Sequence, residues 1–371
     1  MYSQQELDDA VASGVISAEA ADALRAHFER QSATPIADEE QFRLITGFND
    51  IFVSIAAAIL LFAVGWIGQS IGQSAGLTIG SDGPSPLGPL GVAVTAWGLA
   101  LFFTARRRMA LPSILLLLAF VFGVFATAAM AIALAIGPDQ LNNNNLLGGI
   151  VVAASGAIAA VAAWFHWKRF RVPITVAAGA ASVSAIAVGL LMAALGPNAE
   201  SARNIILGLV LLLGIGVFLF AMWWDGSDRA RLTRRSDVAF WLHLLAAPMI
   251  VHPVFTLLGL TNGHVNVGEG LAVIGLYLAL GLTALAVDRR ALLVSALAYV
   301  LYALQALFRE FGAVELNVAL TALVIGSALL LLSAFWHQAR TAVVRPLPES
   351  LRDRLPILDR SAPVEASQPA A

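Results

Sequence analysis

Residues 111–136 read LPSILLLLAFVFGVFATAAMAIALAI, a run of 26 residues without a charged side chain. A helix needs about 20 such residues to cross roughly 30 Å of bilayer hydrocarbon. In hydrocarbon the backbone must satisfy its own hydrogen bonds, which only helices and closed barrels achieve. The run lacks the alternating pattern of a barrel strand. It therefore predicts a transmembrane α-helix.

Comparable apolar runs recur along the 371-residue chain. We place them at 51–71, 87–104, 111–136, 146–165, 174–195, 204–223, 238–260, 271–287, 291–308 and 314–335. The chain is 59% hydrophobic and only 12% charged, whereas a soluble domain is about 25% charged. These observations predict an all-α polytopic transmembrane bundle of about 10 spans, with the lipid bilayer as a partner.

The lysines and arginines fall almost entirely on one side of these runs. Twenty of the 22 lie in the N-terminal segment, in the tail, or in alternate loops near Arg106, Lys168, Arg229 and Arg289. Short loops rich in Lys and Arg stay in the cytoplasm. We therefore expect both termini to be cytoplasmic, which requires an even number of spans.

The composition divides the chain into three parts. Residues 1–46 are acidic and predict a cytosolic helical-hairpin module, with Gly14 ending one short helix at positive φ and Ser17 capping the next. This module is too small for a core of its own, so we expect it to bind another surface, such as a cytosolic protein. Residues 47–337 form the transmembrane domain, and 338–371 are expected to be a cytosolic, largely disordered tail.

The transmembrane domain is predicted to consist of repeated helical hairpins. A spacing of nineteen residues recurs in three pairs: Asn145 with Trp164, Asn204 with Trp223, and Asn317 with Trp336. We expect each Asn to cap a helix and each Trp to lie in an interfacial belt. A further pattern, Gly65, Gly68, Gly72, Gly76 and Gly80, predicts either a closely packed helix end that leads into a loop or a re-entrant segment.

The sequence contains none of the common motifs for catalysis, metal binding or nucleic-acid binding that we searched for. There is no cysteine, which excludes disulfides and thiolate sites. The net charge of −2 provides no basic surface for nucleic acid. No phosphate-binding loop, zinc helix or nucleophile elbow occurs. We therefore expect no enzyme activity, no catalytic residue, no cofactor and no metal.

Two groups of polar residues remain as candidate sites. The first is a polar pathway in the seventh run, with His243, Pro248, His252 and Pro253. Polar groups at bilayer depth usually line an interior or a water-filled path. At 100° per residue the two histidines lie on opposite faces, so only a proline kink would bring them together. The alternative is two neutral histidines, each bonded to a neighbouring helix.

The second group is an outer vestibule at the outer end of the last two runs. Tyr302, Gln305 and Arg309 share one helix face, and Glu315 and Asn317 follow the short turn after them. The alternative interpretation is an interfacial cap with a salt bridge between Arg309 and Glu315.

Several motifs resemble a family of predicted bacterial multi-pass inner-membrane proteins of unknown function with a short N-terminal helical-hairpin domain. They are Leu7 to Leu24 with Gly14-Val15-Ile16-Ser17, Gly47-Phe48-Asn49-Asp50-Ile51-Phe52, and Trp241-Leu242-His243 through His252-Pro253. The resemblance implies a bacterial cytoplasmic (inner) membrane location. It supplies no substrate and no catalytic residue.

For function, the sequence favours transport or permeation of an ion or small solute, with His252 as the polar contact. The alternative is a non-catalytic membrane scaffold or sensor that recruits a partner through residues 1–46. Substrate and partner identity stay open, as does assembly into a homo-oligomer.

Overall fold

The computed structural model describes most of the chain. The described residues are 11–23, 48–80, 82–142, 144–195, 199–229, 231, 233–259, 267–290, 292–294, 297, 300, 301, 304, 308 and 317–358. The chain divides into two compact units, one of Met1–Phe42 with Ile357–Ala371 and one of Arg43–Pro356.

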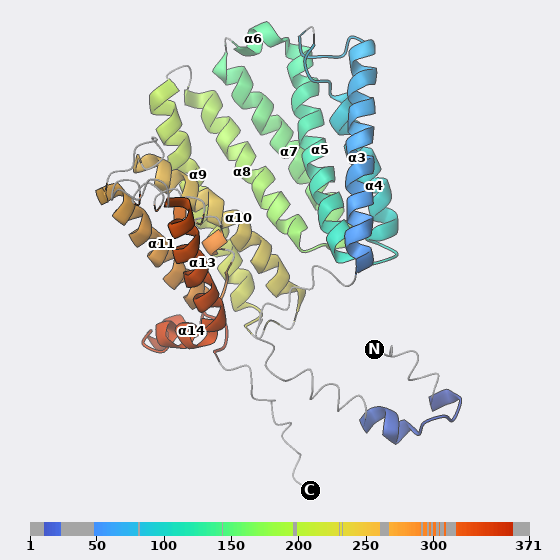
Figure 1. Ribbon diagram of the computed structural model, residues 1–371. Coiled ribbons are helices and arrows are strands. Elements are labelled where there is room, and N and C mark those ends of the chain that lie inside the picture. The colour runs from blue at the N-terminus through green and yellow to red at the C-terminus, as the bar shows by residue number, and fades with distance from the viewer. Residues whose placement is uncertain are drawn as a thin grey trace. The chain divides into compact units, whose positions relative to one another are not determined.

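The larger unit is a bundle of long helices, and no strand occurs among the described residues. The helices are α3 (Phe48–Ser74), α4 (Leu87–Phe103), α5 (Ala110–Ile136), α6 (Pro138–Asn142), α7 (Asn145–Phe170), α8 (Ile174–Leu195), α9 (Ala199–Gly226), α10 (Arg234–Leu257), α11 (Val267–Val287), α13 (Asn317–Ala334), α14 (Trp336–Val344) and α15 (Glu349–Arg352) (Figure 1). Sequential helices pack side by side, most extensively α7 with α8 and α9 with α10. The turns between α4 and α5, α7 and α8, and α9 and α10 lie at one end, which we call the basic end (Figure 1).

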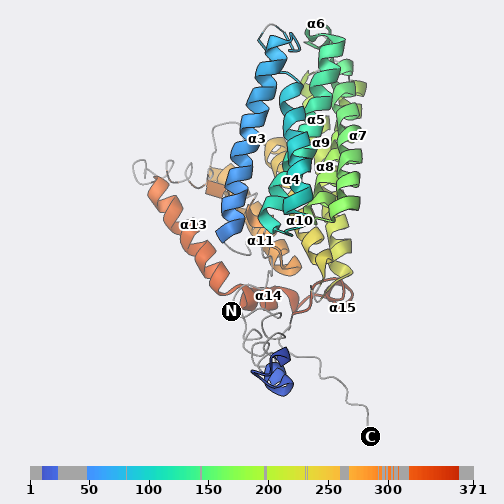
Figure 2. The ribbon, with the colours of Figure 1, turned by 90° about the vertical axis from the view of Figure 1, so that its right-hand side faces the viewer.

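The prediction of an all-α, multi-span bundle is confirmed. Seven described helices are long and apolar enough to cross a membrane. An eighth span arises if α13 and α14, which meet at 76°, count together, and α4 is a shorter apolar helix of 17 residues (Figure 2). The described residues of the ninth run, 291–308, are helical. The total of about 10 spans stays a prediction.

The glycine run on α3 allows a close approach to α4. A Cβ on Gly68 would lie 2.9 Å from the Gly88 Cα and closer still to the carbonyl oxygen of Leu87. Beside it the Gln69 side chain donates to the Gly83 carbonyl at 3.1 Å and accepts from the Ser85 amide at 2.8 Å. Since α3 continues unbroken to Ser74, Gly65, Gly68 and Gly72 belong to a packed helix end, and Gly76 and Gly80 follow in the loop at positive φ.

The expected Asn/Trp repeat holds only in part. Asn144, not Asn145, caps α7, because its side chain accepts from the amides of Leu146 and Leu147 at 3.1 and 3.4 Å. Asn204 lies inside α9, which begins earlier than the apolar run does.

The third tryptophan of the repeat also differs. Trp164 and Trp223 are 53% and 64% exposed, as an interfacial belt requires, whereas Trp336 is only 6% exposed. Its indole N–H donates to an Asp288 carboxylate oxygen at 2.8 Å. A buried indole N–H needs such a hydrogen-bond partner. Trp336 is therefore a buried residue and not part of the predicted interfacial belt.

The predicted disordered tail is ordered over its first part. Residues 338–358 contain most of α14, all of α15 and the turns after them, and 359–371 lie outside the described residues. Arg340 is fully buried and donates to the Pro356 carbonyl oxygen at 2.7 Å. A polar composition predicted disorder here, but buried partners for the guanidinium group hold the segment in place.

In the smaller unit, residues 11–23 bear out two local predictions. Gly14 has φ +74° at the end of a helical turn. The Ser17 hydroxyl oxygen accepts from the Ala20 amide at 3.1 Å and so caps the next helix. The rest of the predicted hairpin lies outside the described residues.

Candidate functional site

A buried cluster of charged side chains lies at the basic end, and Asp225 is its centre. Asp225 is in the last turn of α9 and is 1% exposed. Arg289, just after α11, holds it in a bidentate pair, with nitrogen to oxygen distances of 2.5 Å from Nη2 and 3.3 Å from Nε. A bidentate guanidinium–carboxylate pair fixes the two groups in one plane, so α9 and α11 are tied at this point.

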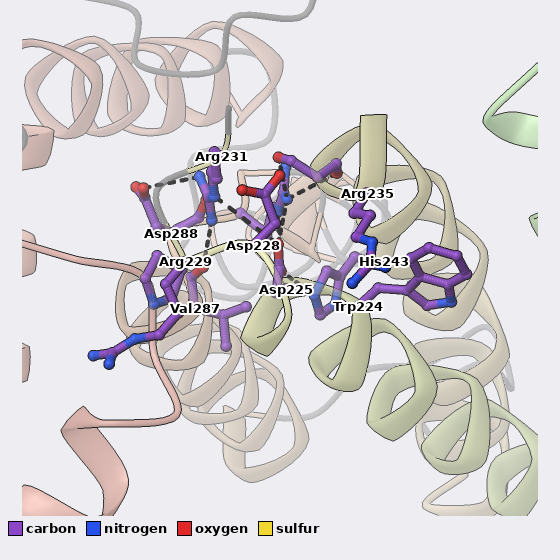
Figure 3. Close-up of polar contacts among 12 residues, drawn as sticks. Trp224, Asp225, Asp228, Arg229, Arg231, Arg235, His243, Val287 and Asp288 are labelled. Atoms are coloured by element: carbon purple, nitrogen blue, oxygen red, sulfur yellow. Dashed lines mark hydrogen bonds and ion pairs between the residues drawn. The ribbon is translucent and has the colours of Figure 1, made fainter. Parts of the chain in front are cut away.

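His243 of α10 is the next partner of Asp225 (Figure 3). Its Nε2 lies 3.0 Å from Asp225 Oδ2, and its ring packs edge-on against Phe218 with centroids 5.1 Å apart. The side chain is fully buried, and its Nδ1 has no hydrogen-bond partner among the described residues. The neutral tautomer with the proton on Nε2 fits these contacts, because it donates to the carboxylate.

A second carboxylate, Asp288, lies beside the first (Figure 3). Arg231 donates to its Oδ2 at 2.9 Å and to the carbonyl oxygens of Val287 and Asp288 at 2.9 and 3.0 Å. Trp336 donates to Oδ1, and the Arg340 Nε lies 3.7 Å from the same oxygen. Asp288 therefore connects the α9–α10 turn with α14.

Further contacts join the two carboxylates into one cluster. Arg231 Nε lies 3.9 Å from Asp225 Oδ1, and Arg289 also donates to the carbonyl and hydroxyl oxygens of Ser236 at 3.0 and 3.1 Å. Arg231 and Asp288 adopt positive φ, 55° and 59°. Non-glycine residues in this region carry a backbone cost of about 1–3 kcal/mol each. The ion pairs thus hold two strained positions.

The turn between α9 and α10 is built to present Arg231. Asp228 accepts from the Thr233 amide at 2.9 Å and from its hydroxyl at 2.6 Å, and Thr233 in turn caps α10. In the same turn, Arg229 donates to the carbonyl oxygens of Leu355 and Arg352 at 3.0 and 3.2 Å. The chain after α14 is thereby fastened beside the cluster.

A small cavity adjoins the cluster. It has a volume of about 150 Å³ and is lined by residues of α11 and α13, by Leu293, Val294 and Leu297, and by Trp336. Its walls are mostly apolar, with Tyr277, Arg290, Ser333 and Trp336 as the polar lining residues. The Arg290 guanidinium lies 4.9 Å from the centroid of the Trp336 ring. Trp336 thus both lines the cavity and binds Asp288 of the cluster.

The structure separates the residues of the predicted polar pathway. His243 is fully buried, whereas His252 is exposed, and the two face different surroundings on α10. Pro248 is exposed and Pro253 is buried, and the helix runs through both without interruption. The two histidines therefore have different surroundings on one unbroken helix, and the role of His252 as a polar contact stays a prediction.

Most of the predicted outer vestibule falls where the structure gives no description. Tyr302, Gln305, Arg309 and Glu315 lie outside the described residues. Asn317 is the first residue of α13.

The carboxylates of the cluster were not predicted from the sequence. The arginines near Arg231 and Arg289 were interpreted only as markers of orientation. A signal was present, because Asp225 and Asp288 each follow a long apolar run and each is followed within four residues by an arginine. Burying a carboxylate at the end of an apolar helix costs free energy unless the carboxylate pairs with a cation.

Comparison with known proteins adds no relative: the chain matches no protein-family model, no curated protein and no solved structure. The family resemblance of the sequence motifs is therefore not confirmed. Among the described residues no group of three His, Asp or Glu side chains is arranged to hold a metal ion. Fold and site together define a class, an α-helical multi-span protein of membrane type with a buried ion-pair cluster at one end.

Proposed function

We propose that the protein is a permeation or transport protein for an ion or small solute, and that the buried cluster is its gate at the cytoplasmic side. The single observation that carries the proposal is that Asp225 and Asp288 join α9, α10, α11 and α14 at the basic end through buried ion pairs and hydrogen bonds.

The energetics favour a switch over a purely structural role. Burying ions is costly, and apolar side chains of similar volume often stabilise a fold equally well or better. The best-attested use of buried ion pairs is to specify one arrangement over another. Here two such pairs, Asp225 with Arg289 and Asp288 with Arg231, tie the end of α9 and the turn after it to the segment that follows α11. Water entering between them would solvate every member. A closed state of this kind can open without breaking any helix.

The cavity beside Trp336 supports the same proposal. Its apolar walls and the cation of Arg290 suit a small solute with an anionic or polar group. Displacing Trp336 from Asp288 would open the cavity toward the cluster, since Trp336 lines the one and binds the other.

We expect Asp288→Asn to increase leakage. The amide keeps the size of the side chain but loses its charge on Arg231 and Arg340, so the closed state is weakened. A shift of about 1 kcal/mol raises the open population about fivefold. The measurement is swelling of proteoliposomes in gradients of glycerol, sodium acetate and potassium chloride.

Glu349→Gln is the matched control, because this carboxylate is 87% exposed and pairs only weakly with Arg352 at 3.5 Å. It should leave the swelling rate unchanged. Equal rates for the parent chain, Asp288→Asn and Glu349→Gln would contradict the gate.

A scaffold or sensor is the second candidate, because residues 1–42 belong to a compact unit separate from the bundle. The same swelling assay on a chain lacking residues 1–45 separates the two. A transporter keeps its flux without this segment. A scaffold shows no flux in either form and loses a cellular phenotype when the segment is removed.

A further inference from the structure

A groove lined by tryptophans opens on the side of the bundle. It has a volume of about 350 Å³. Three indoles and several small side chains line it: Trp164, Trp167, Trp224, Ala160, Ala163, Thr175, Val176, Gly179 and Val183. The lining comes from α7, α8 and the end of α9, all of which are apolar enough to span a membrane. The groove therefore faces acyl chains when the protein is in a bilayer.

The groove lies close to the basic end of these helices. Trp164 and Trp167 are in the last two turns of α7, and Gly179 is in the second turn of α8. At about 1.5 Å per residue, these residues lie within roughly 10 Å of the helix ends. This is the depth at which tryptophan is enriched and at which a lipid passes from acyl chain to headgroup.

A cation stands at the edge of the groove. Lys168, the single lysine of the chain, is exposed, and its Nζ lies 5.6 Å from the centroid of the Trp164 ring. Arg169 and Arg171 follow in the same turn and are exposed as well. An apolar groove with a cationic rim complements a molecule that has a long apolar chain and an anionic head.

We propose that this groove binds an anionic phospholipid, with one acyl chain against the three tryptophans and the phosphate beside Lys168. The small residues Ala163 and Gly179 form the floor on which the chain lies. The groove shares no lining residue with the ion pairs of the proposed gate, and this proposal does not depend on that one.

The test is native mass spectrometry of the purified full chain with phosphatidylglycerol or phosphatidylcholine of identical acyl chains. Gly179→Leu should fill the groove without distorting the fold, because a Cβ there meets only the Ala163 Cβ, at 3.9 Å. We expect Gly179→Leu to weaken binding of phosphatidylglycerol by about tenfold. Lys168→Gln should weaken phosphatidylglycerol and leave phosphatidylcholine unchanged.

Gly216→Leu is the matched control, since Gly216 is an exposed α9 glycine at which an added Cβ would have nothing within 4 Å. Val183→Trp fills the same groove from its rim and replaces Gly179→Leu if that variant fails to fold. Unchanged phosphatidylglycerol binding in the groove variants would overturn the proposal. Equal effects of Lys168→Gln on both lipids would also overturn it. So would groove variants that abolish a dimer of the chain while their lipid binding stays unchanged.

Discussion

Replacing Arg289 with alanine should destabilise the protein by about 3–5 kcal/mol, the usual cost of removing one partner from a buried ion pair. Arg289 is 3% exposed and supplies both hydrogen bonds of the bidentate pair with Asp225. Without it the carboxylate would stay buried, beside His243 and the more distant Arg231. Thermal unfolding of the purified chain, followed by tryptophan fluorescence, measures the loss.

Two comparisons make this prediction specific. Arg290→Ala removes the neighbouring cation, which lies over the Trp336 ring outside the Asp225 pair, and should cost only about 0.5–1 kcal/mol. The double variant Asp225→Leu with Arg289→Leu should recover most of the stability, because no buried charge of that pair remains. If Arg289→Ala unfolds at the temperature of the parent chain, the pair with Asp225 contributes nothing.

Gly149→Ala is expected to be the second variant with a large effect, because it forces α7 and α8 apart. A Cβ on Gly149 would lie 2.5 Å from the Gly189 carbonyl oxygen and closer still to the Ala193 backbone nitrogen. Both atoms belong to the α8 backbone, so no side-chain rotation relieves the clash. Overpacking of this kind costs about 1–3 kcal/mol or more. Thermal unfolding and the yield of monodisperse protein measure the effect.

Gly148→Ala is the control for this variant, since the adjacent glycine has nothing within 4 Å of an added Cβ. It should leave stability unchanged or raise it by about 0.5–1 kcal/mol, because alanine is the better helix residue. Equal behaviour of the Gly148 and Gly149 variants would show that α7 and α8 do not pack this closely.

The spans were predictable because hydropathy is a local property of the chain. The run 174–195 coincides with α8, and 111–136 differs from α5 by one residue. Helix ends were less predictable, since a cap depends on one side chain. Asn144 and Asn145 are equally suitable by type, and only the backbone geometry selects Asn144.

The candidate site depends on pairings that no local pattern encodes. Asp225 and its partner Arg289 are 64 residues apart in the sequence, and Asp288 and its partner Trp336 are 48 residues apart. His243 was predictable as a polar residue within an apolar run, and its partner proved to be Asp225, in the preceding helix. The order of residues 338–358 was missed for the same reason, since it depends on Arg340 and Arg229 finding distant partners.

The gate is tested most directly by the accessibility of a single cysteine at Ala247. The natural chain has no cysteine, so Ala247→Cys provides one thiol, placed one helical turn beyond His243 at a site 1% exposed. A membrane-impermeant maleimide added from the basic side reacts only with a thiolate, which forms in water. Leu278→Cys, 61% exposed on an apolar span, is the control for a position facing lipid. We expect no labelling of Ala247→Cys in the otherwise natural chain and clear labelling when Asp288→Asn is added. Labelling that is the same with and without Asp288→Asn would contradict the gate.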